Sequence, residues 1–228
     1  MPTNPPPDIS GRPTFWRGKG LLWLSLTLSL LAVAALWIDM SLARYFVTTP
    51  VKGDLRKLIQ LSEAFAYGGT VAIILLTTAV LDRRGWRILP RLAASALGAG
   101  LVADILKLCV ARTRPDHAEL AGTATATFLR LFPGEHLHST QSFPSAHTAT
   151  GIGLACGLAF LYPRGRWLFL VLALSAGTQR MMDQKHFLSD VLAGAAVGAL
   201  CGWLVTAAWP LANWLERLEL HERHNPAG

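Results

Sequence analysis

Six apolar segments constrain this chain more than any other feature of its sequence. A bilayer core about 30 Å thick requires roughly 20 apolar residues per helix, with a working range of about 17–25. Four of the six segments contain no Asp, Glu, Lys or Arg; the third contains Asp104 and Lys107, and the fifth contains Arg180. Unpaired backbone groups are costly inside lipid, so these segments are expected to be helices. They are Leu21–Ile38, Ala64–Leu81, Leu92–Ala111, Ala146–Tyr162, Trp167–Met182 and Val191–Trp209.

The composition excludes several other classes of protein. Only 15% of the residues are charged and 52% are apolar, whereas soluble domains carry about 25% charged residues. Eight Trp and nine Phe argue against disorder, and three widely separated cysteines exclude a disulfide scaffold. We expect an all-α, polytopic membrane protein with six transmembrane helices over residues 21–210. A flexible N-terminal tail (1–20) and a cytoplasmic C-terminal tail (211–228) flank this domain.

The first apolar segment follows Arg17 and Lys19 and so resembles a signal peptide. It continues unbroken to Ile38, however, which is longer than the usual apolar region of about 7–15 residues. We interpret it as an uncleaved span. With the N-terminus inside, eleven cations lie on the cytoplasmic side and ten on the other. Three of those ten belong to the candidate site below, so the remaining count favours a cytoplasmic N-terminus.

Two further patterns concern packing and the loops. In Val51–Leu61 apolar residues alternate with charged ones, which indicates a short amphipathic helix at the membrane interface, a solvated turn being the alternative. Residues 112–145 form the largest loop. Gly194, Gly198 and Gly202 recur every fourth residue, a spacing that allows close helix approach. Packing within the chain is favoured over a dimer face.

Polar residues are expensive in a membrane protein, and here they gather in three clusters. Lys107–Pro115 closes the third segment, Pro144–His147 opens the fourth, and Arg180–Asp190 joins the fifth and sixth. Two spans lie between the second and third clusters. All three clusters are therefore expected on the same side of the membrane.

Each cluster also has a structural interpretation when it is taken alone. Lys107 and Asp104 are three residues apart and can pair on a helix. Arg112 and Arg114 can anchor the helix end by snorkelling. Pro-Ser before an apolar helix is an ordinary start signal, with Ser145 as the cap. The third cluster alone is equally typical of a helix cap at the surface.

The functional interpretation uses the same residues. Pro115 pushes Arg114 out of the α region and so places a guanidinium where the chain leaves the membrane. The helix N-terminus at His147 offers free N–H groups and a partial positive charge, which suit an anion. His186 and Asp190 are four residues apart, so the carboxylate can reach the imidazole and fix its tautomer.

Together the clusters supply three permanent cations, a helix N-terminus, a histidine backed by an aspartate, and a second histidine. This set describes a site for a multiply charged oxyanion, and phosphate fits best because arginine binds it bidentately. Two histidines beside a phosphate indicate a nucleophile and a general acid.

The spacings resemble a known set of motifs. Lys107-x6-Arg114-Pro115, Pro144-Ser145-x-His147 and Arg180-x5-His186-x3-Asp190 resemble the three signature motifs of the type 2 phosphatidic acid phosphatase superfamily. Its integral-membrane members are lipid phosphate phosphatases that share a core with the vanadium haloperoxidases. The resemblance implies a metal-independent enzyme without a cofactor.

The resemblance also implies roles for individual residues. His186 resembles the nucleophile that forms a phosphohistidine, Asp190 would orient it, and His147 resembles the general acid for the leaving lipid oxygen. The remaining positions would bind the phosphoryl group through cations, a hydroxyl and a backbone N–H. They are Lys107, Arg114, Ser145, Ala146 and Arg180.

Two positions depart from the usual pattern, since the family commonly has Gly at Ala146 and Ser at Gln179. These changes affect substrate geometry but not the nucleophile. Asp183 and Lys185 match no family position and are interpreted as loop charges. The pair His136 and His138 lies in a polar loop, and no metal is assigned to it.

The leading hypothesis is a lipid phosphate or diphosphate phosphatase of a bacterial inner membrane, with its site facing the periplasm or outside. Candidate substrates by resemblance are undecaprenyl diphosphate, phosphatidic acid, phosphatidylglycerol phosphate and lipid A. The expected partners are the bilayer and the lipid phosphate, not a nucleic acid. The alternatives are a lipid phosphotransferase, a haloperoxidase, which the apolar spans disfavour, and a non-catalytic protein that binds or transports lipid phosphate.

Overall fold

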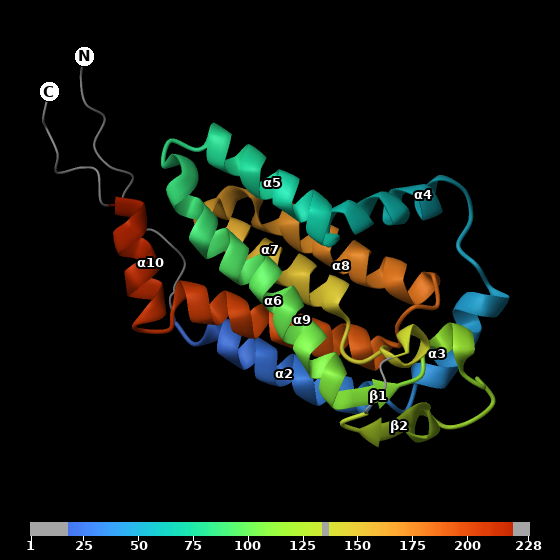
Figure 1. The fold of residues 1–228 in the computed structure, drawn as a ribbon. Coiled ribbons are helices and arrows are strands. Elements are labelled where there is room, and N and C mark those ends of the chain that lie inside the picture. The colour runs from blue at the N-terminus through green and yellow to red at the C-terminus, as the bar shows by residue number, and fades with distance from the viewer. Residues whose placement is uncertain (1–17, 134–136, 221–228) are drawn as a thin grey trace, which may run out of the picture.

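Each of the six apolar segments forms a helix in the computed structural model, which describes residues 18–133 and 137–220. The observed helix ends lie within four residues of the predicted ones, and most of the predicted N-terminal tail lies outside the described residues. The helices are α2 (Gly20–Ala35), α5 (Gly68–Leu81), α6 (Leu89–Cys109), α7 (Ala146–Leu161), α8 (Arg166–Met182) and α9 (Leu188–Thr206) (Figure 1).

Shorter elements connect these helices. The predicted amphipathic segment forms α4 (Gly53–Leu61), which confirms a helix there, and none of its residues is buried. A two-stranded antiparallel sheet is formed by β1 (Val110–Arg112), at the start of the large loop, and β2 (Phe128–Leu131), within that loop. The remaining helices are α3 (Asp39–Thr48) and α10 (Leu211–Leu220), and the 3-10 turns are η2 (Ser62–Phe65), η3 (Gly85–Ile88), η4 (Pro115–His117), η5 (Ala124–Thr127), η6 (His138–Thr140) and η7 (Pro163–Gly165).

Among the described residues, two helices are long and apolar enough to cross a membrane alone, Gly85–Cys109 and Leu188–Thr206. Two bent pairs also qualify if each pair is counted as one span. They are α2 with α3, bent by 74°, and α4–η2 with α5, bent by 69°. By length and composition the number of spans is thus two to four. The all-α architecture is confirmed, and the count of six spans stays a prediction.

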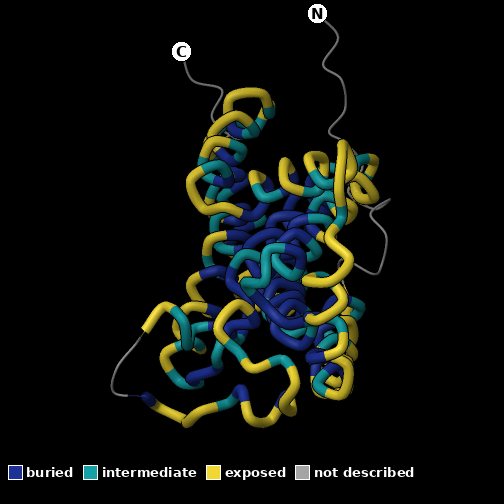
Figure 2. Tube along the Cα trace, turned by 90° about the vertical axis from the view of Figure 1, so that its right-hand side faces the viewer, coloured by how far each residue is buried: buried dark blue, intermediate teal, exposed yellow. Residues whose placement is uncertain are grey.

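Helix α7 is the centre of the bundle. Every residue of α7 except His147 is buried, because α6, α8 and α9 pack around it and α2 packs on α9. Figure 2 shows the buried residues gathered along the middle of the molecule, with exposed segments around them. His147 is the exception because it lies in the first turn, where the helix opens toward the large loop.

Glycines allow α9 to approach α7 closely. A Cβ on Gly194 would lie 2.3 Å from the Ser145 carbonyl oxygen, and one on Gly198 would lie 2.6 Å from the Ala149 oxygen. Gly202 likewise faces Cys156 of α7. All three glycines therefore face α7 of the same chain, which confirms the predicted packing within the chain.

The predicted C-terminal tail begins with α10, which docks on the end of the bundle away from the large loop (Figure 1). The Arg91 guanidinium of α6 donates from Nε to Glu219 Oε1 at 2.6 Å and from Nη1 to the Val205 carbonyl oxygen. It also lies over the Phe160 ring, 4.7 Å from the centroid. Arg91 and Glu219 are both buried, so one ion pair fixes α10 to α6.

Candidate active site

The three polar clusters predicted from the sequence meet at one end of the bundle. Lys107 lies in the last turn of α6 and Arg180 in the last turn of α8. The N-terminus of α7 and the turn that carries His186 lie at the same end, beside β1 (Figure 1). Asp190 lies in the first turn of α9. The antiparallel order of the helices produces this convergence, because each cluster stands where a helix enters or leaves that end.

His186 is buried and its ring is held by a backbone carbonyl. Its Nδ1 lies 2.7 Å from the Ser142 carbonyl oxygen, whereas the Asp190 Oδ2 atom is 3.9 Å away. A carbonyl oxygen only accepts hydrogen bonds, so Nδ1 carries the proton and Nε2 keeps its lone pair. Asp190 lies beside His186, but the hydrogen bond that orients the imidazole comes from Ser142.

The surroundings of His186 favour its neutral form. Burial lowers the pKa of His186 well below its usual value near 6.5, and the positive charges of Lys107, Arg180 and Arg114 lower it further. The three cations of the motifs therefore act on the imidazole through their charge. A neutral imidazole with a free Nε2 is a nucleophile that is ready to react at neutral pH.

Ser145 acts as the predicted cap of α7. Its side-chain oxygen accepts a hydrogen bond from the Thr148 backbone N–H at 3.4 Å and lies 3.0 Å from the Thr148 hydroxyl. Its backbone N–H donates to the Asp190 carbonyl oxygen at 3.0 Å, which fixes the start of α7 against α9. Ala146 and His147 follow in the first turn, where the positive end of the helix dipole faces the site.

The two arginines of the motifs each keep one unsatisfied donor. The Nε atoms of Arg114 and Arg180 are buried and have no hydrogen-bond partner among the described residues. Burial is also the main cause that lowers the pKa of Arg114, followed by the charge of Arg180. Buried donors without partners are rare in proteins and call for an explanation. An oxyanion between the two guanidinium groups would supply the missing acceptors.

Lys107 forms the local pair that its spacing allows. Its ammonium lies 3.0 Å from Asp104 Oδ1, one helical turn earlier. The Lys107 side chain is largely buried, whereas the Asp104 carboxylate is exposed. Lys107 therefore fits both the structural and the functional interpretation of its cluster. Its ammonium pairs with Asp104, and its positive charge lowers the pKa of His186.

Glu63 is a site residue that the sequence analysis missed. It comes from η2, before α5, and its Oε1 accepts from Arg180 Nη1 at 2.9 Å and lies 3.8 Å from His147 Nε2. Its Oε2 accepts from the Gln179 amide at 3.3 Å. A single glutamate at the end of an amphipathic helix has no spacing signal that marks it. Only the fold brings it to Arg180.

Other polar residues of this end have structural partners. Gln179 also donates to Asp183 Oδ2 at 2.7 Å, and Lys185 pairs with Asp116 at 2.7 Å, consistent with the interpretation of Asp183 and Lys185 as loop charges.

Among the described residues, no group of three His, Cys, Asp or Glu side chains is placed to hold a metal ion. His136 lies outside the described residues, so nothing tests the interpretation of its pairing with His138.

The fold defines a helical membrane protein whose cationic and histidine motif residues meet at one end of the bundle. The chain belongs to the PAP2 superfamily, whose family model matches residues 89–214. It is a multi-pass membrane protein and a phosphatase of this superfamily. This result confirms the predicted family and the predicted class of enzyme.

Curated relatives and a solved structure agree with this assignment. The chain is 31% identical to a lipid A 1-phosphatase of Rhizobium johnstonii over 89% of its own length and 95% of the relative. It is 42% identical to a lipid A 4'-phosphatase of Bacteroides thetaiotaomicron over 44% of each chain. A transmembrane PAP2-type phosphatidylglycerolphosphate phosphatase from Bacillus subtilis shares the fold with a TM-score of 0.55 at 19% identity, over 92% of this chain and 100% of that one.

Proposed function

We propose that this protein removes phosphate from a membrane lipid through a phosphohistidine on His186, with lipid A as the favoured substrate. The single observation that carries the chemistry is the contact of His186 Nδ1 with the Ser142 carbonyl oxygen, which puts the proton on Nδ1 and leaves the lone pair on Nε2. Lipid A is favoured because the relative that aligns over most of this chain is named for that substrate. Phosphatidylglycerol phosphate, phosphatidic acid and undecaprenyl diphosphate are the other candidates.

The reaction has two steps. In the first, His186 Nε2 attacks phosphorus, the bond from phosphorus to the lipid oxygen breaks, and His147 gives its proton to that oxygen. In the second, water attacks phosphorus, His147 takes a proton from the water, and the phosphorus–nitrogen bond breaks to release phosphate. Lys107, Arg114 and Arg180 stabilise the negative charge in both transition states.

The helix N-terminus supplies further donors to the phosphoryl group. The Ser145 hydroxyl and the Ala146 backbone N–H lie where α7 begins, and hydrogen bonds from them add to the charge of the cations. Because six spans and a cytoplasmic N-terminus are predicted, the site faces the periplasm, and the lipid enters from the outer leaflet of the inner membrane.

Phosphate release from a panel of the four lipids by the purified protein tests this proposal. We expect His186→Ala to lose nearly all activity while it stays folded, and His138→Ala, a matched change at an exposed histidine of the same end, to keep it. Turnover by His186→Ala would contradict the proposed nucleophile.

Trapping of a labelled phosphoenzyme separates an enzyme from a binding or transport protein, because a pure binder forms none. Addition of a lipid alcohol tests phosphotransfer, since a transferase would convert the phosphoenzyme to a new lipid phosphate instead of releasing inorganic phosphate. We expect hydrolysis to dominate.

A further inference from the structure

A buried charge network lies behind the nucleophile. Arg112 donates from Nη2 to Asp39 Oδ2 at 2.7 Å, from Nη1 to Asp190 Oδ1, and from Nη1 to the Ser189 hydroxyl at 2.6 Å. Its Nε donates to the Thr127 hydroxyl at 3.0 Å. The side chains of Arg112, Asp39 and Asp190 are fully buried. All three nitrogen atoms of the Arg112 guanidinium therefore donate hydrogen bonds to protein groups, and the side chain has no exposure to solvent.

This network reaches His186 through Ser142. The Ser142 backbone N–H donates to the Arg112 carbonyl oxygen at 3.1 Å, and its hydroxyl donates to Asp190 Oδ2 at 2.6 Å. Asp190 Oδ2 also accepts the Phe187 backbone N–H at 2.8 Å. Ser142 is therefore fixed by Arg112 directly and through Asp190. Its carbonyl oxygen is the atom that holds His186 Nδ1.

Asp39 ties the network to the N-terminal helices. It is the first residue of α3, and its Oδ1 accepts the Ser189 backbone N–H at 3.0 Å, while its Oδ2 accepts the Ser189 hydroxyl. It stands outside residues 89–214, the part that the family model matches. The contact therefore joins a helix outside the matched region to the start of α9.

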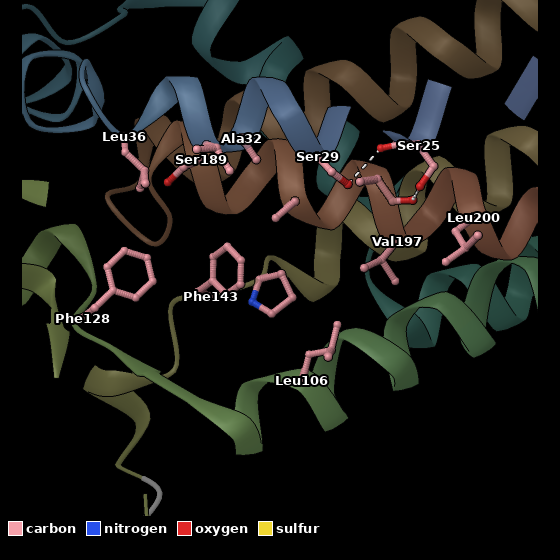
Figure 3. Close-up of a pocket in the computed structure, with 14 residues that line it drawn as sticks. Ser25, Ser29, Ala32, Leu36, Leu106, Phe128, Phe143, Ser189, Val197 and Leu200 are labelled. Carbon is pink, nitrogen blue, oxygen red and sulfur yellow. Dashed lines mark hydrogen bonds between the residues drawn. The ribbon is translucent and has the colours of Figure 1, made fainter. Parts of the chain in front are cut away.

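The network is shielded from water. The rings of Phe128 and Phe187 each lie 4.4 Å from the Arg112 guanidinium. Behind Ser189 an apolar groove of about 320 Å³ runs between α2, α6 and α9, and Phe128 and Phe143 close one end of it (Figure 3). Charges in such surroundings act strongly on one another. Two carboxylates and one guanidinium leave one net negative charge behind His186.

We propose that Asp39 and Arg112 are positioning residues for the nucleophile. They hold Asp190 and Ser142 so that the Ser142 carbonyl keeps the proton of His186 on Nδ1. Together with Asp190 they form a group with one net negative charge, which stabilises the positively charged ring of the phosphohistidine. This inference rests on the proposed function. The groups that face the ring from the other elements are Lys107 of α6, Arg114 after β1 and Arg180 of α8, all cationic, and Asp190 of α9.

The test uses Asp39→Asn in the full chain, purified in detergent, with two readouts. Histidine ¹⁵N NMR at pH 7.5 reports the tautomer, and steady-state kinetics separates kcat from KM. We expect the wild-type protein to show His186 protonated only on Nδ1 and the variant to show a mixture with the Nε2–H form. We expect kcat to fall about 10–100-fold with KM within about threefold.

Two further variants make the test specific. Asp39→Glu keeps the charge and is expected to restore most of the kcat and the single tautomer. Ser25→Ala is the matched control, because it removes another buried contact of this N-terminal segment with α9, the hydrogen bond to the Ala196 carbonyl oxygen at 2.8 Å, without a change of charge near His186. It should leave both readouts unchanged. Arg112→Lys keeps the positive charge but cannot form all the hydrogen bonds of the guanidinium to Asp39, Asp190 and Thr127, so we expect it to lower kcat.

The inference is overturned if Asp39→Asn keeps the Nδ1–H tautomer and its kcat, or if it loses activity only in proportion to unfolded protein. A wild-type protein that releases no phosphate from any lipid would contradict the proposed function instead. The tautomer comparison would still decide the role of Asp39 in that case.

Discussion

The Arg180 guanidinium is already paired before any phosphate arrives, because Glu63 accepts a hydrogen bond from its Nη1 atom. The Glu63 carboxylate also lies 3.8 Å from Nε2 of His147, the residue that we propose as the proton donor to the leaving group. A phosphate that enters the site meets this negative charge. Part of the attraction that the three cations exert on the substrate is therefore offset by Glu63.

Replacing this carboxylate tests its effect on oxyanion binding. We expect Glu63→Gln to tighten inhibition by inorganic phosphate about fivefold, since loss of a like charge near a bound anion contributes about 1 kcal/mol. The control is Asp54→Asn, which removes the charge of an exposed carboxylate in α4 that pairs with Lys57 at 3.1 Å. Inhibition constants measured at one ionic strength check this. Weaker inhibition in Glu63→Gln would show that Glu63 positions Arg180 rather than competing with phosphate.

The lowered pKa of His186 also predicts a pH dependence of stability. In the unfolded chain this histidine titrates near pH 6.5, whereas in the folded protein it stays neutral to lower pH. Between these two values the unfolded state binds more protons, so the free energy of unfolding rises with pH. This contribution is fully present above about pH 6.5 and is lost as the pH falls below it.

Thermal unfolding in detergent between pH 8 and pH 5 measures this effect. We expect the unfolding temperature of His186→Gln to fall less steeply on acidification than that of the wild type. His117→Gln, at an exposed histidine of the same end, should keep the wild-type slope. Equal slopes in all three proteins would mean that His186 is as easily protonated in the folded state as in the unfolded chain.

At the scale of elements, the contact of α9 with α7 sets the geometry of the site. Gly194 lies against the Ser145 carbonyl oxygen, one helical turn after Asp190. The same residue Ser145 donates its backbone N–H to the Asp190 carbonyl. The absence of a side chain at Gly194 therefore lets two segments of the candidate site, the start of α7 and the start of α9, bond directly.

A methyl group at this position tests the contact. In Gly194→Ala the new Cβ would lie 2.3 Å from a backbone oxygen, so the helices must separate. We expect a loss of about 1–3 kcal/mol of stability and at least a tenfold loss of kcat. Gly98→Ala in α6 is the matched control, because its Cβ would meet only the Ala93 oxygen at 3.9 Å. If both variants unfold alike and remain active, the close approach does not position the site.

The contact of α10 with α6 includes the buried ion pair of Arg91 and Glu219. Removal of one partner leaves the other charge buried without compensation, which costs about 3–5 kcal/mol. We expect Glu219→Ala to lower the free energy of unfolding by about this amount and to expose the bond after Arg217 to trypsin. Asn213→Ala, at an exposed position of the same helix, serves as the comparison. Unchanged proteolysis and stability in Glu219→Ala would show that α10 docks through its apolar contacts alone.

At the scale of the whole molecule, the proposal places the two ends of the bundle on opposite sides of the membrane. The large loop with the active site is expected outside, and the turn η7 between α7 and α8 inside. In a variant without the three native cysteines, we expect Ala121→Cys to react with a membrane-impermeant maleimide in intact cells. Arg164→Cys, in η7, should react only after permeabilisation. The reverse pattern would contradict the orientation and leave the fold unaffected.

The sequence by itself determined the helices and the motif residues. An apolar run long enough to cross lipid must satisfy its own backbone, so each run becomes a helix wherever it packs. The Ser145 cap of α7 was also predictable from the sequence, because its hydrogen bond joins residues only three positions apart. The order of the helices then brought Lys107, Arg114, His147 and His186 to one end.

Only the tertiary structure decided which groups hold those residues. Asp190 was expected to bind His186 because four residues on a helix bring side chains together, yet His186 lies before α9 begins, and its ring turns to the Ser142 carbonyl instead. Asp39 and Glu63 lie more than forty residues before the first motif residue, Lys107, and no sequence spacing connects them to the motifs. Buried charges are satisfied by whichever partner the packing brings within hydrogen-bond distance, and that choice depends on all the helices at once.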